Sequence, residues 1–296
     1  MNITLARTYL AVLDLRNFNR AAEYLNVTQS TVTTRINSLE SLVGQRLFHR
    51  SRSGVEPTDA GQRFRTYAEM IIQIWKQAQQ DLLLPNARST QFKFAAESAL
   101  WPGLAKDFLK KIYRDNANIS VLVENKSADA INSCLAQGIY DAALLYDVRP
   151  RTNVVFEYLF EEQLVLVSTT PRTQCVWHPE YTYVEWGRDF DMEHAKIKPP
   201  EITPPVIINY GNWALDWIEE LGGSAYFPTR MIFDKVEEGT LHVVPDVNPF
   251  TRSVWFSYRE KMAENDWFPQ ILNDLKEISE RLKERNAGFI KKWKLL

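Results

Sequence analysis

Apolar side chains in the first 45 residues recur three or four positions apart, which is the spacing of short amphipathic helices. Asn19 and Thr28 each precede such a pattern and are expected to be N-caps, because their side-chain oxygens can accept hydrogen bonds from free backbone N–H groups. Gly44 is expected to end the third helix. The second and third helices, joined by a tight turn, make a helix-turn-helix motif. The predicted helices cover residues 5–13, 20–25 and 29–43.

A basic hairpin is predicted directly after the third helix. Phe48 and Val55 are apolar anchors on either side of a tip, residues 49–54, that contains Arg50 and Arg52. A basic loop beside a recognition helix is placed to contact phosphates or the minor groove of DNA, which is the role of a wing. The pattern therefore predicts a winged helix-turn-helix.

A longer helix with a narrow apolar seam is predicted over residues 59–84, with Thr58 as its N-cap. Apolar or small residues alternate four and three positions apart along it, which is the period of a coiled coil. Such a seam can lie against its own domain, but its period favours a homodimer, which would present two recognition helices to a palindromic DNA site. The seam positions are Phe64, Ala68, Ile71, Trp75, Ala78 and Leu82.

From about residue 90 onward, short apolar runs alternate with amphipathic stretches, and this order predicts strands and helices in turn. The β-α-β-α-β order at the start implies a parallel sheet with helices on both faces, so the fold class of this part is α/β. Strands are expected at residues 92–96, 119–123, 140–145, 164–167, 182–184, 206–208, 222–228 and 254–257. Helices are expected at residues 101–113, 128–137, 214–221 and 265–285, and a further step from helix to strand is expected at residues 236–239.

Charge is distributed unevenly between the helical head and the rest of the chain. Residues 1–65 contain nine arginines, five acidic residues and no lysine, a net charge of +4, whereas the whole chain carries −2. The remaining residues therefore carry −6. An arginine-rich head on an acidic body suggests an anionic partner for the head.

The outer face of the third helix consists mainly of hydroxyl and amide side chains. An exposed helix face normally carries Glu and Lys, but neither occurs between Thr28 and Ser38. Short polar side chains at a helix N-terminus can reach base edges and phosphates in the major groove, so double-stranded DNA is the expected partner. The candidate DNA-binding residues are Gln29, Ser30, Thr31, Thr33, Thr34 and Arg35 on this helix, with Arg50 and Arg52 in the wing.

Composition limits the remaining classes of protein. The chain has 296 residues, 45% of them hydrophobic and 12% aromatic, which fits two folded domains and excludes a largely disordered chain. No apolar stretch is long enough to span a membrane, and the N-terminus lacks the pattern of a secretory signal. Two cysteines cannot form a disulfide scaffold. A cytoplasmic protein without a membrane partner is therefore expected.

The motifs give no support for catalysis. Neither a phosphate-binding glycine loop nor a nucleophile elbow occurs, and the four histidines lack metal-ligand spacing, so no catalytic residue, metal or cofactor is expected. Cys134 is most simply a small core residue. Cys175, with Arg172 and His178 nearby, could be a redox-sensing thiol, although a structural cysteine is the simpler interpretation.

Residues 1–84 resemble the DNA-binding head of LysR-type transcriptional regulators. Two positions depart from the family: Ser30 stands where proline is usual, and Thr34-Arg35 stands where Arg-Gln is common. The preferred bases are therefore expected to differ from the family's usual site. The matching positions are Phe18, Ala21, Ala22, Leu25, Val27, Thr28, Gln29, Val32, Ile36, Leu39, Glu40, Gly44, Leu47, Phe48, Arg50, Thr58, Ala60 and Gly61.

The resemblance implies a sequence-specific transcriptional regulator, not an enzyme, that works as a homodimer or homotetramer and responds to a small-molecule effector. Its body is expected to resemble a periplasmic binding protein, with the effector between two α/β lobes. A redox-sensing regulator acting through Cys175 is one alternative, and an enzyme or small-molecule binder with an accessory helical head is another. The implied parts are the winged helix-turn-helix (1–58), a linker and dimerisation helix (59–87), and an effector domain (88–296) with lobes at about 88–160 plus 262–296 and about 161–261.

The effector pocket is expected where strand ends of the two lobes face a crevice. Helix N-termini near Ser98 and Ser127, with the charge of Lys126, would suit an anionic effector. Trp186 could stack on a planar effector, or it could equally be a core residue in a turn. The expected lining is Ser98, Leu100, Trp101, Lys126, Ser127 and Tyr146 from the first lobe, and Trp186, Asn209, Tyr210 and Phe227 from the second.

Overall fold

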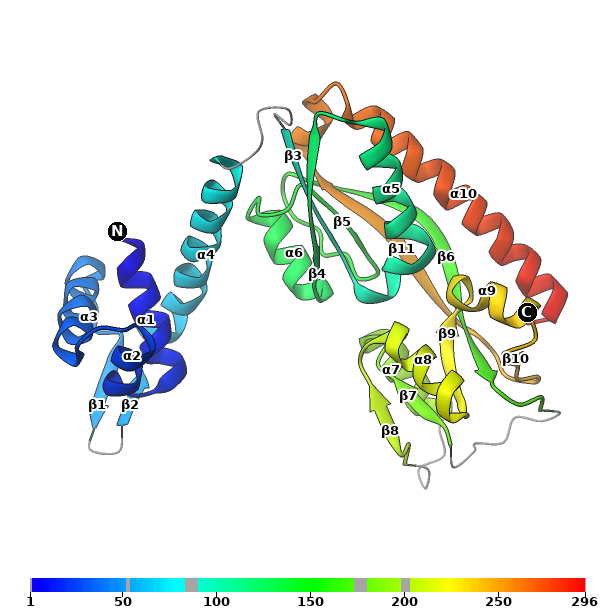
Figure 1. Ribbon diagram of the computed structural model, residues 1–296, viewed down its shortest axis with the longest axis horizontal. Coiled ribbons are helices and arrows are strands. Elements are labelled where there is room, and N and C mark those ends of the chain that lie inside the picture. Colours follow the sequence, from blue (N-terminus) through cyan, green and yellow to red (C-terminus); the bar gives the residue numbers. More distant parts are fainter. Residues whose placement is uncertain (1, 52–53, 83–89, 173–179, 198–202, 296) are drawn as a thin grey trace. The chain divides into compact units, whose positions relative to one another are not determined.

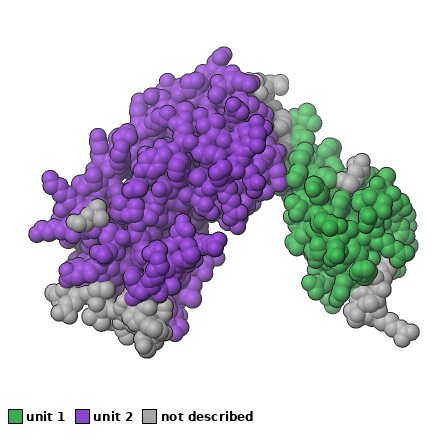
Figure 2. Space-filling view, turned by 180° about the vertical axis from the view of Figure 1, so that it is seen from behind, with its two compact units in different colours: residues 1–85 green, residues 86–296 purple. Residues whose placement is uncertain are grey.

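The computed structural model describes residues 2–51, 54–82, 90–172, 180–197 and 203–295 of the chain. They divide into two units, residues 1–85 and residues 86–296, which Figure 2 shows in different colours. Each unit buries hydrophobic side chains of its own.

Alanine and aromatic side chains form the core of the first unit. Its helices are α1 (Ile3–Leu15), α2 (Phe18–Tyr24), α3 (Gln29–Val43) and α4 (Asp59–Leu82) (Figure 1). Ala21 and Ala22 are buried in α2, where small side chains let helices pack closely. Tyr9 of α1 is fully buried, and its hydroxyl donates a hydrogen bond of 2.7 Å to the carbonyl of Gly61 in α4. α1 is therefore the central element of the head, in contact with each of the other helices.

The third helix begins and ends where the sequence predicts. Thr28 Oγ1 accepts a hydrogen bond of 3.2 Å from the backbone N–H of Thr31, and Gly44 ends α3 with a φ of 72°. A positive φ is readily adopted by glycine because it has no Cβ. Both predicted caps of α3 are confirmed.

The predicted N-cap of the second helix is wrong. Asn17, not Asn19, caps α2, and its side chain accepts hydrogen bonds from the backbone N–H groups of Asn19 and Arg20 at 2.8 and 3.2 Å. The physical reason is the burial of Phe18 in the core as the first residue of α2, so that the cap must precede it.

The predicted hairpin is present as the antiparallel strands β1 (Phe48–Ser51) and β2 (Gly54–Pro57). Glu40 of α3 accepts hydrogen bonds from the backbone N–H groups of Leu47 and Phe48 at 2.8 and 3.2 Å, so α3 and the hairpin are joined directly. Arg50 lies in β1, and Arg52 lies outside the described residues.

The apolar seam of α4 divides into two parts. Phe64, Ala68 and Ile71 pack against the core of their own unit, whereas Trp75 and Leu82 are exposed. Thr58 caps the helix as expected, accepting a hydrogen bond of 2.9 Å from the N–H of Gly61. The interpretation of the whole seam as one intersubunit surface is therefore corrected, because its first half already has a partner in α1.

A seven-stranded mixed sheet organises the second unit (Figure 1). Its strands are β3 (Thr90–Ala96), β4 (Ile119–Asn125), β5 (Ala142–Leu145), β6 (Val154–Ser168), β9 (Ser224–Pro228), β10 (His242–Val243) and β11 (Phe250–Arg259). They run in the order β10-β6-β11-β5-β3-β4, and β9 also pairs with β6. β3 is parallel to β4 and β5, as predicted, and the long strands β6 and β11 pair in antiparallel orientation along most of their length.

Helices cover both faces of this sheet, as the strand order predicts. Phe94 of β3 packs in a cluster with side chains of α5 and α10, whereas its neighbour Ala95 packs on the opposite face with side chains of α6. These helices are α5 (Lys106–Asp115), α6 (Ala128–Ala136) and α10 (Phe268–Trp293). This cluster of β3, β5, α5 and α10 is the core of the first lobe.

A second core lies around β9 and a small parallel pair of strands. The elements of this second lobe are β7 (Thr182–Val184), α7 (Arg188–Ile197), β8 (Val206–Ile208), α8 (Gly211–Leu221) and α9 (Thr229–Glu237). β6 contributes side chains to both cores, and so does α10, whose Phe289 and Ile290 pack with the second. The two lobes are thus joined by shared elements.

Several boundaries differ from the sequence prediction for physical reasons. β6 begins ten residues before the expected strand, because charged residues such as Glu157 and Glu161 interrupt its apolar pattern. The helix expected from residue 101 begins at Lys106, because non-helical backbone at Pro102 and Gly103 precedes it. The sequence does not predict α7, and of α9 it predicts only the end, within the step from helix to strand at residues 236–239.

Within the described ranges, no helix combines the length and the apolar character that crossing a membrane requires.

Candidate functional site

The outer face of α3 presents short polar side chains to solvent. Gln29, Ser30 and Thr34 are exposed, and Thr31 and Thr33 are partly buried. The hydroxyl of Thr28 lies 2.9 Å from that of Ser30 and 2.8 Å from that of Thr31, so the first turn carries a small hydroxyl cluster. These groups stand beside the free backbone N–H groups of the helix N-terminus, where phosphates are attracted.

Arg35 is turned toward α1 instead of straight outward. Its Nη1 lies 3.5 Å from the hydroxyl of Thr8, at the limit of a hydrogen bond, and its side chain is partly buried. Thr8 is itself fully buried and donates to the carbonyl of Thr4 at 2.7 Å. A contact of Arg35 with DNA therefore requires its side chain to leave this weak interaction, and its role stays a prediction.

A polar cavity of about 420 Å³ lies between the two lobes of the second unit. Its walls follow the ends of β3, β4 and β5 on one side, and the segments before α7 and α8 on the other. Seven of the ten expected effector residues line it: Ser98, Lys126, Ser127, Tyr146, Trp186, Asn209 and Tyr210. The lining also contains Glu97, Ala99, Asn125, Glu185, Gly187, Gly211 and Arg252, which were not expected.

Three expected residues do not reach this cavity. Leu100 is fully buried in the core of the first lobe, and Phe227 is fully buried in the second, where its ring lies 5.9 Å from that of Trp186. Trp101 lines a separate surface hollow with Pro102 and Tyr113. Alternation along a strand and the turn after β3 send these side chains away from the crevice.

Trp186 is a structural wall of the cavity. It is 4% exposed, and its indole N–H donates a hydrogen bond of 2.7 Å to the carbonyl of Tyr226. A Cβ added at Gly211 would lie 2.2 Å from the Trp186 ring, so α8 approaches the ring closely. This geometry favours the core interpretation of Trp186, with only part of the side chain facing the cavity.

Lys126 lines the cavity but already has an anionic partner. Its ammonium lies 3.3 Å from a carboxylate oxygen of Glu124, which also accepts a hydrogen bond of 2.6 Å from the hydroxyl of Tyr140. Partly exposed ion pairs of this kind contribute little stability, so Lys126 can still exchange its partner.

Arg252 on β11 is a half-buried cationic side chain that lines the cavity. Its guanidinium carbon lies 3.4 Å from the ring centroid of Tyr146, which is the close stacked geometry of a cation–π contact. Its Nη1 is buried and has no hydrogen-bond partner in the part of the chain that the structure describes. A charged residue beside a predicted buried strand needs a partner, and this is the sequence signal that points to Arg252. The strand predicted at residues 254–257 begins two residues after Arg252 and therefore does not include it.

A buried ion pair forms the floor beside Tyr146. Arg230 Nε lies 2.9 Å from Glu162 Oε2, and the two side chains are 2% and 1% exposed. Arg230 also donates to the carbonyls of Ala99 and Pro102, and the hydroxyl of Tyr146 donates to Glu162. Burial raises the pKa of Tyr146 well above its ordinary value, so the hydroxyl keeps its proton and remains a donor.

Glu97 supports the loop that carries Tyr146. Its carboxylate accepts a hydrogen bond of 2.7 Å from the backbone N–H of Tyr146. Burial raises the pKa of Glu97, while this hydrogen bond and the positive charge of Arg252 lower it in part. The cavity is therefore lined by one half-buried carboxyl group and one half-buried guanidinium, each in contact with the same tyrosine.

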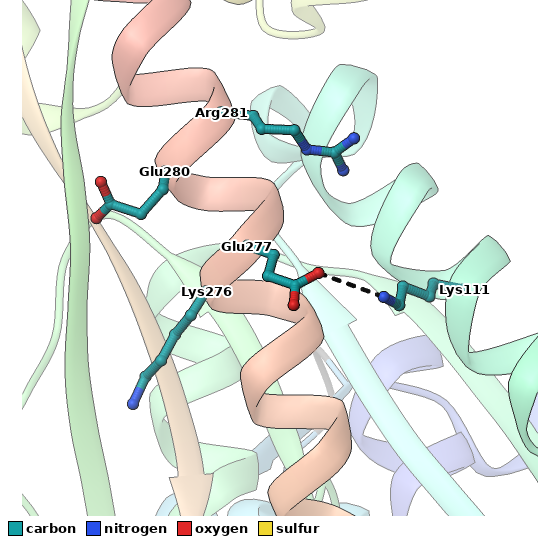
Figure 3. Close-up of a pocket in the computed structure, with 5 residues that line it drawn as sticks. All are labelled: Lys111, Lys276, Glu277, Glu280 and Arg281. Carbon is teal, nitrogen blue, oxygen red and sulfur yellow. Dashed lines mark ion pairs between the residues drawn. The ribbon is translucent and has the colours of Figure 1, made fainter.

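A surface hollow lined by α5 and α10 differs from the polar cavity between the lobes. Figure 3 shows Glu277 and Arg281 of α10 on the side of Lys111 of α5, whereas Lys276 and Glu280 point away from α5. Lys111 is already paired with Asp274 at 2.9 Å and with Glu277 at 3.5 Å. These ion pairs join α5 to α10, and no set of polar groups among these described side chains converges on a common point.

Metal and thiol chemistry find no further support in the described residues. Within them, no group of three His, Cys, Asp or Glu side chains is placed to hold a metal ion. Cys134 lies on α6, and burial raises the pKa of its thiol, which lowers its reactivity. Cys175 and His178 lie outside the described residues.

Family comparisons assign both units. A family described as "Bacterial regulatory helix-turn-helix protein, lysR family" matches residues 3–62, and a family described as "LysR substrate binding domain" matches residues 85–275. The chain is 26% identical over 269 residues to the HTH-type transcriptional regulator HdfR of Shigella boydii, which covers 89% of this chain and 95% of that protein. HdfR of Escherichia coli aligns with the same figures.

Solved structures share the fold at lower identity. Full-length LysG from Corynebacterium glutamicum superposes with a TM-score of 0.54 at 15% identity, over 95% of this chain and 98% of that one. Vibrio fischeri DarR in complex with DNA gives a TM-score of 0.55 at 18% identity, over 93% and 98% of the two chains. The helical head and the two-lobed body thus occur together in other proteins.

Proposed function

Because the chain belongs to the LysR family and is a transcriptional regulator with a DNA-binding and an effector-binding domain, we propose that a small molecule in the cavity around Arg252 controls its binding to promoter DNA. The observation that carries this proposal is the buried Arg252 Nη1, a donor without a partner in the described residues, on a side chain that lines a cavity of about 420 Å³. Ligand cavities are typically about 300–1,000 Å³ and contain a few placed polar groups.

The DNA-binding surface proposed for the head is the N-terminal half of α3 together with the wing. Its support is the absence of acidic side chains between residues 28 and 38, the exposed hydroxyls of Ser30 and Thr34, and the net charge of +4 over residues 1–65. The neutral side chains would read base edges, and Arg50 and Arg52 of the wing would contact phosphates.

Effector control requires two states of the body that bind the effector with different affinity. β6 and α10 contribute side chains to the cores of both lobes. A movement of one lobe toward the other around a ligand would therefore also move these elements and change the surface that the body presents to other subunits. We propose a homodimer or homotetramer that would transmit this change to the spacing of two recognition helices. As a regulator of promoters, the protein would work in the cytoplasm, where the chromosome lies, and would carry out no catalysis.

Sequencing of genomic fragments retained by the full chain tests this function. Wild type should enrich a small set of promoter regions that share a two-fold symmetric motif. A Ser30→Glu/Thr34→Glu variant should retain none, because carboxylates at the helix N-terminal face repel phosphates. Glu220→Gln, which removes one charge from an exposed position of α8 outside the cavity lining, is the control. Equal enrichment by the wild type and this double variant would contradict the proposed DNA face.

A further inference from the structure

We propose that the cavity around Arg252 takes a small zwitterion, a molecule with one carboxylate and one ammonium group such as an α-amino acid. Its carboxylate lies against the guanidinium of Arg252, and its ammonium lies toward Glu97. The inference rests on the proposed function, because it names the chemical class of the effector at that same site.

Arg252 provides the site for the carboxylate. Its guanidinium carbon lies 3.4 Å from the ring centroid of Tyr146, and its buried Nη1 has no acceptor among the described residues. An unpaired buried donor is costly, so a ligand that supplies the acceptor gains the hydrogen bond. Guanidinium groups bind carboxylates through two parallel hydrogen bonds, which suits a planar carboxylate better than a lone hydroxyl.

The protein's own carboxylate opposite Arg252 is already occupied. Glu162 is the cross-strand neighbour of Arg252, but it pairs with Arg230 and accepts a hydrogen bond from Tyr146. The fold therefore satisfies one arginine completely and leaves a second one facing the cavity. An anionic group from outside completes the arrangement.

Glu97 provides the site for the ammonium. It lines the cavity, and no described cation forms an ion pair with it. Its hydrogen bond to the N–H of Tyr146 fixes the carboxylate near the same tyrosine that carries Arg252. Burial destabilises its charged form, as the raised pKa of Glu97 indicates, and a ligand ammonium would stabilise that form.

The charges of the lining favour a zwitterion over a dianion or a simple amine. Two acids, Glu97 and Glu185, and two bases, Lys126 and Arg252, line the cavity, and Lys126 is already paired with Glu124 outside the lining. A dianion such as a phosphate ester would face Glu97 without compensation, and a simple amine would leave Arg252 without an acceptor. A zwitterion satisfies both Glu97 and Arg252.

The test is binding of the twenty L-amino acids to the full chain, first by thermal shift and then by titration calorimetry. Each amino acid that raises Tm is compared with its decarboxylated amine and with its deaminated acid, which have the same side chain. We expect at least one amino acid to bind, and both matched analogues to bind weaker by about ten-fold or more, since each loses one charged hydrogen-bonding group.

Two variants separate the two halves of the site. Arg252→Gln should weaken the amino acid and the deaminated acid by about ten-fold or more and leave the amine unchanged. Glu97→Gln should weaken the amino acid and the amine but not the acid, and its amide oxygen still accepts the Tyr146 hydrogen bond, so the loop is retained. Arg149→Gln is the matched control, because Arg149 is exposed and pairs with Asp129 outside the lining.

The inference is overturned if no L-amino acid raises Tm, if the acid or the amine binds as tightly as the amino acid, or if Glu97→Gln binds the amino acid like wild type. DNA binding by the same preparations keeps these outcomes distinct from failure of the proposed function. A chain that binds its promoters and responds to an uncharged metabolite keeps the proposed function and loses only the zwitterion.

Discussion

Glu162 and Arg252 occupy opposite positions on β6 and β11, yet Glu162 forms its ion pair with Arg230, at 2.9 Å. The hydroxyl of Tyr146 donates to Glu162, and Arg252 lies on the ring of the same tyrosine. Tyr146 therefore connects a fully satisfied buried pair to a guanidinium that faces the cavity. The Glu162–Arg230 ion pair is expected to determine stability, and the Arg252 guanidinium is expected to determine ligand binding.

Arg230→Met should destabilise the full chain strongly. Removing one partner of a buried ion pair leaves an uncompensated charge, which costs about 3–5 kcal/mol of the free energy of unfolding. The double variant Glu162→Leu/Arg230→Met should recover most of this loss, because apolar replacements of a whole buried pair are often neutral. Urea unfolding followed by circular dichroism measures both.

The control for that experiment is Lys235→Met, which removes a more exposed ion pair with Glu219 at 2.6 Å. Its cost should be about 0–1 kcal/mol. If Arg230→Met were no more destabilising than Lys235→Met, the Glu162–Arg230 pair would not have the structural role inferred from its burial.

Thr34→Ala and Arg35→Ala should each reduce discrimination between an operator and random duplex by about 1–3 kcal/mol, the range for a lost base contact. Fluorescence anisotropy with unlabelled competitor measures it. Ser41→Ala, an exposed position near the other end of α3, is the control. If only Thr34→Ala loses discrimination, Arg35 stays with Thr8 of α1 and does not read bases.

The exposed half of the α4 seam is expected to join subunits. Trp75→Asp/Leu82→Asp should shift the full chain toward monomer in sedimentation velocity, because these seam side chains are 42% and 87% exposed. Ile71→Asp should instead lower Tm, since Ile71 packs on its own unit. A double variant that sediments like wild type would place the subunit contact elsewhere.

The sequence predicted elements whose signals are local. The 15-residue α3 was located because Thr28 and Gly44 have cap chemistry that depends only on the adjacent backbone. The Val206–Ile208 strand was located because it is a short apolar run between prolines and a helix. Seven residues of the candidate cavity were found by the same reasoning, since strand ends in an α/β sheet must face one side.

The missed features depend on pairing across long sequence separations. Glu162, Arg230 and Arg252 come from β6, α9 and β11, and nothing in their immediate neighbours indicates which two would pair. The division of the α4 seam likewise follows from the position of α1, which covers Ala68 but not Trp75. Periodicity shows that a face is apolar and does not show what covers it.

Glu97→Gln should stabilise the unliganded protein at neutral pH. The pKa of Glu97 in the folded chain lies above its ordinary value of 4.5, mainly because of burial, so the folded state binds this proton more tightly than the unfolded state. Its contribution to stability therefore falls as the pH rises from about 4.5 through the raised pKa. A glutamine at this position does not ionise, so the variant does not undergo this pH-dependent loss of stability.

In measurements from pH 4 to pH 8, the Tm of Glu97→Gln minus the Tm of wild type should increase as the pH rises. Glu185→Gln, which removes an exposed carboxylate at the rim of the same cavity, is the matched control. A wild type and Glu97→Gln with parallel pH profiles would mean that the Glu97 carboxylate is well solvated in the folded chain.

Ser98→Ala should abolish the response to effector while leaving promoter binding in its absence intact. Ser98 lies directly after β3 and lines the cavity, where its hydroxyl can bind a polar ligand group. Losing a hydrogen bond to a charged group costs about 1.5–3 kcal/mol, a shift in affinity of about ten-fold or more. A reporter fused to a bound promoter, scored against a metabolite library, measures the response. The contrasting variant is Cys134→Ser/Cys175→Ser, which should respond like wild type. A normal response in Ser98→Ala together with a lost response in the cysteine variant would replace metabolite sensing by a redox switch.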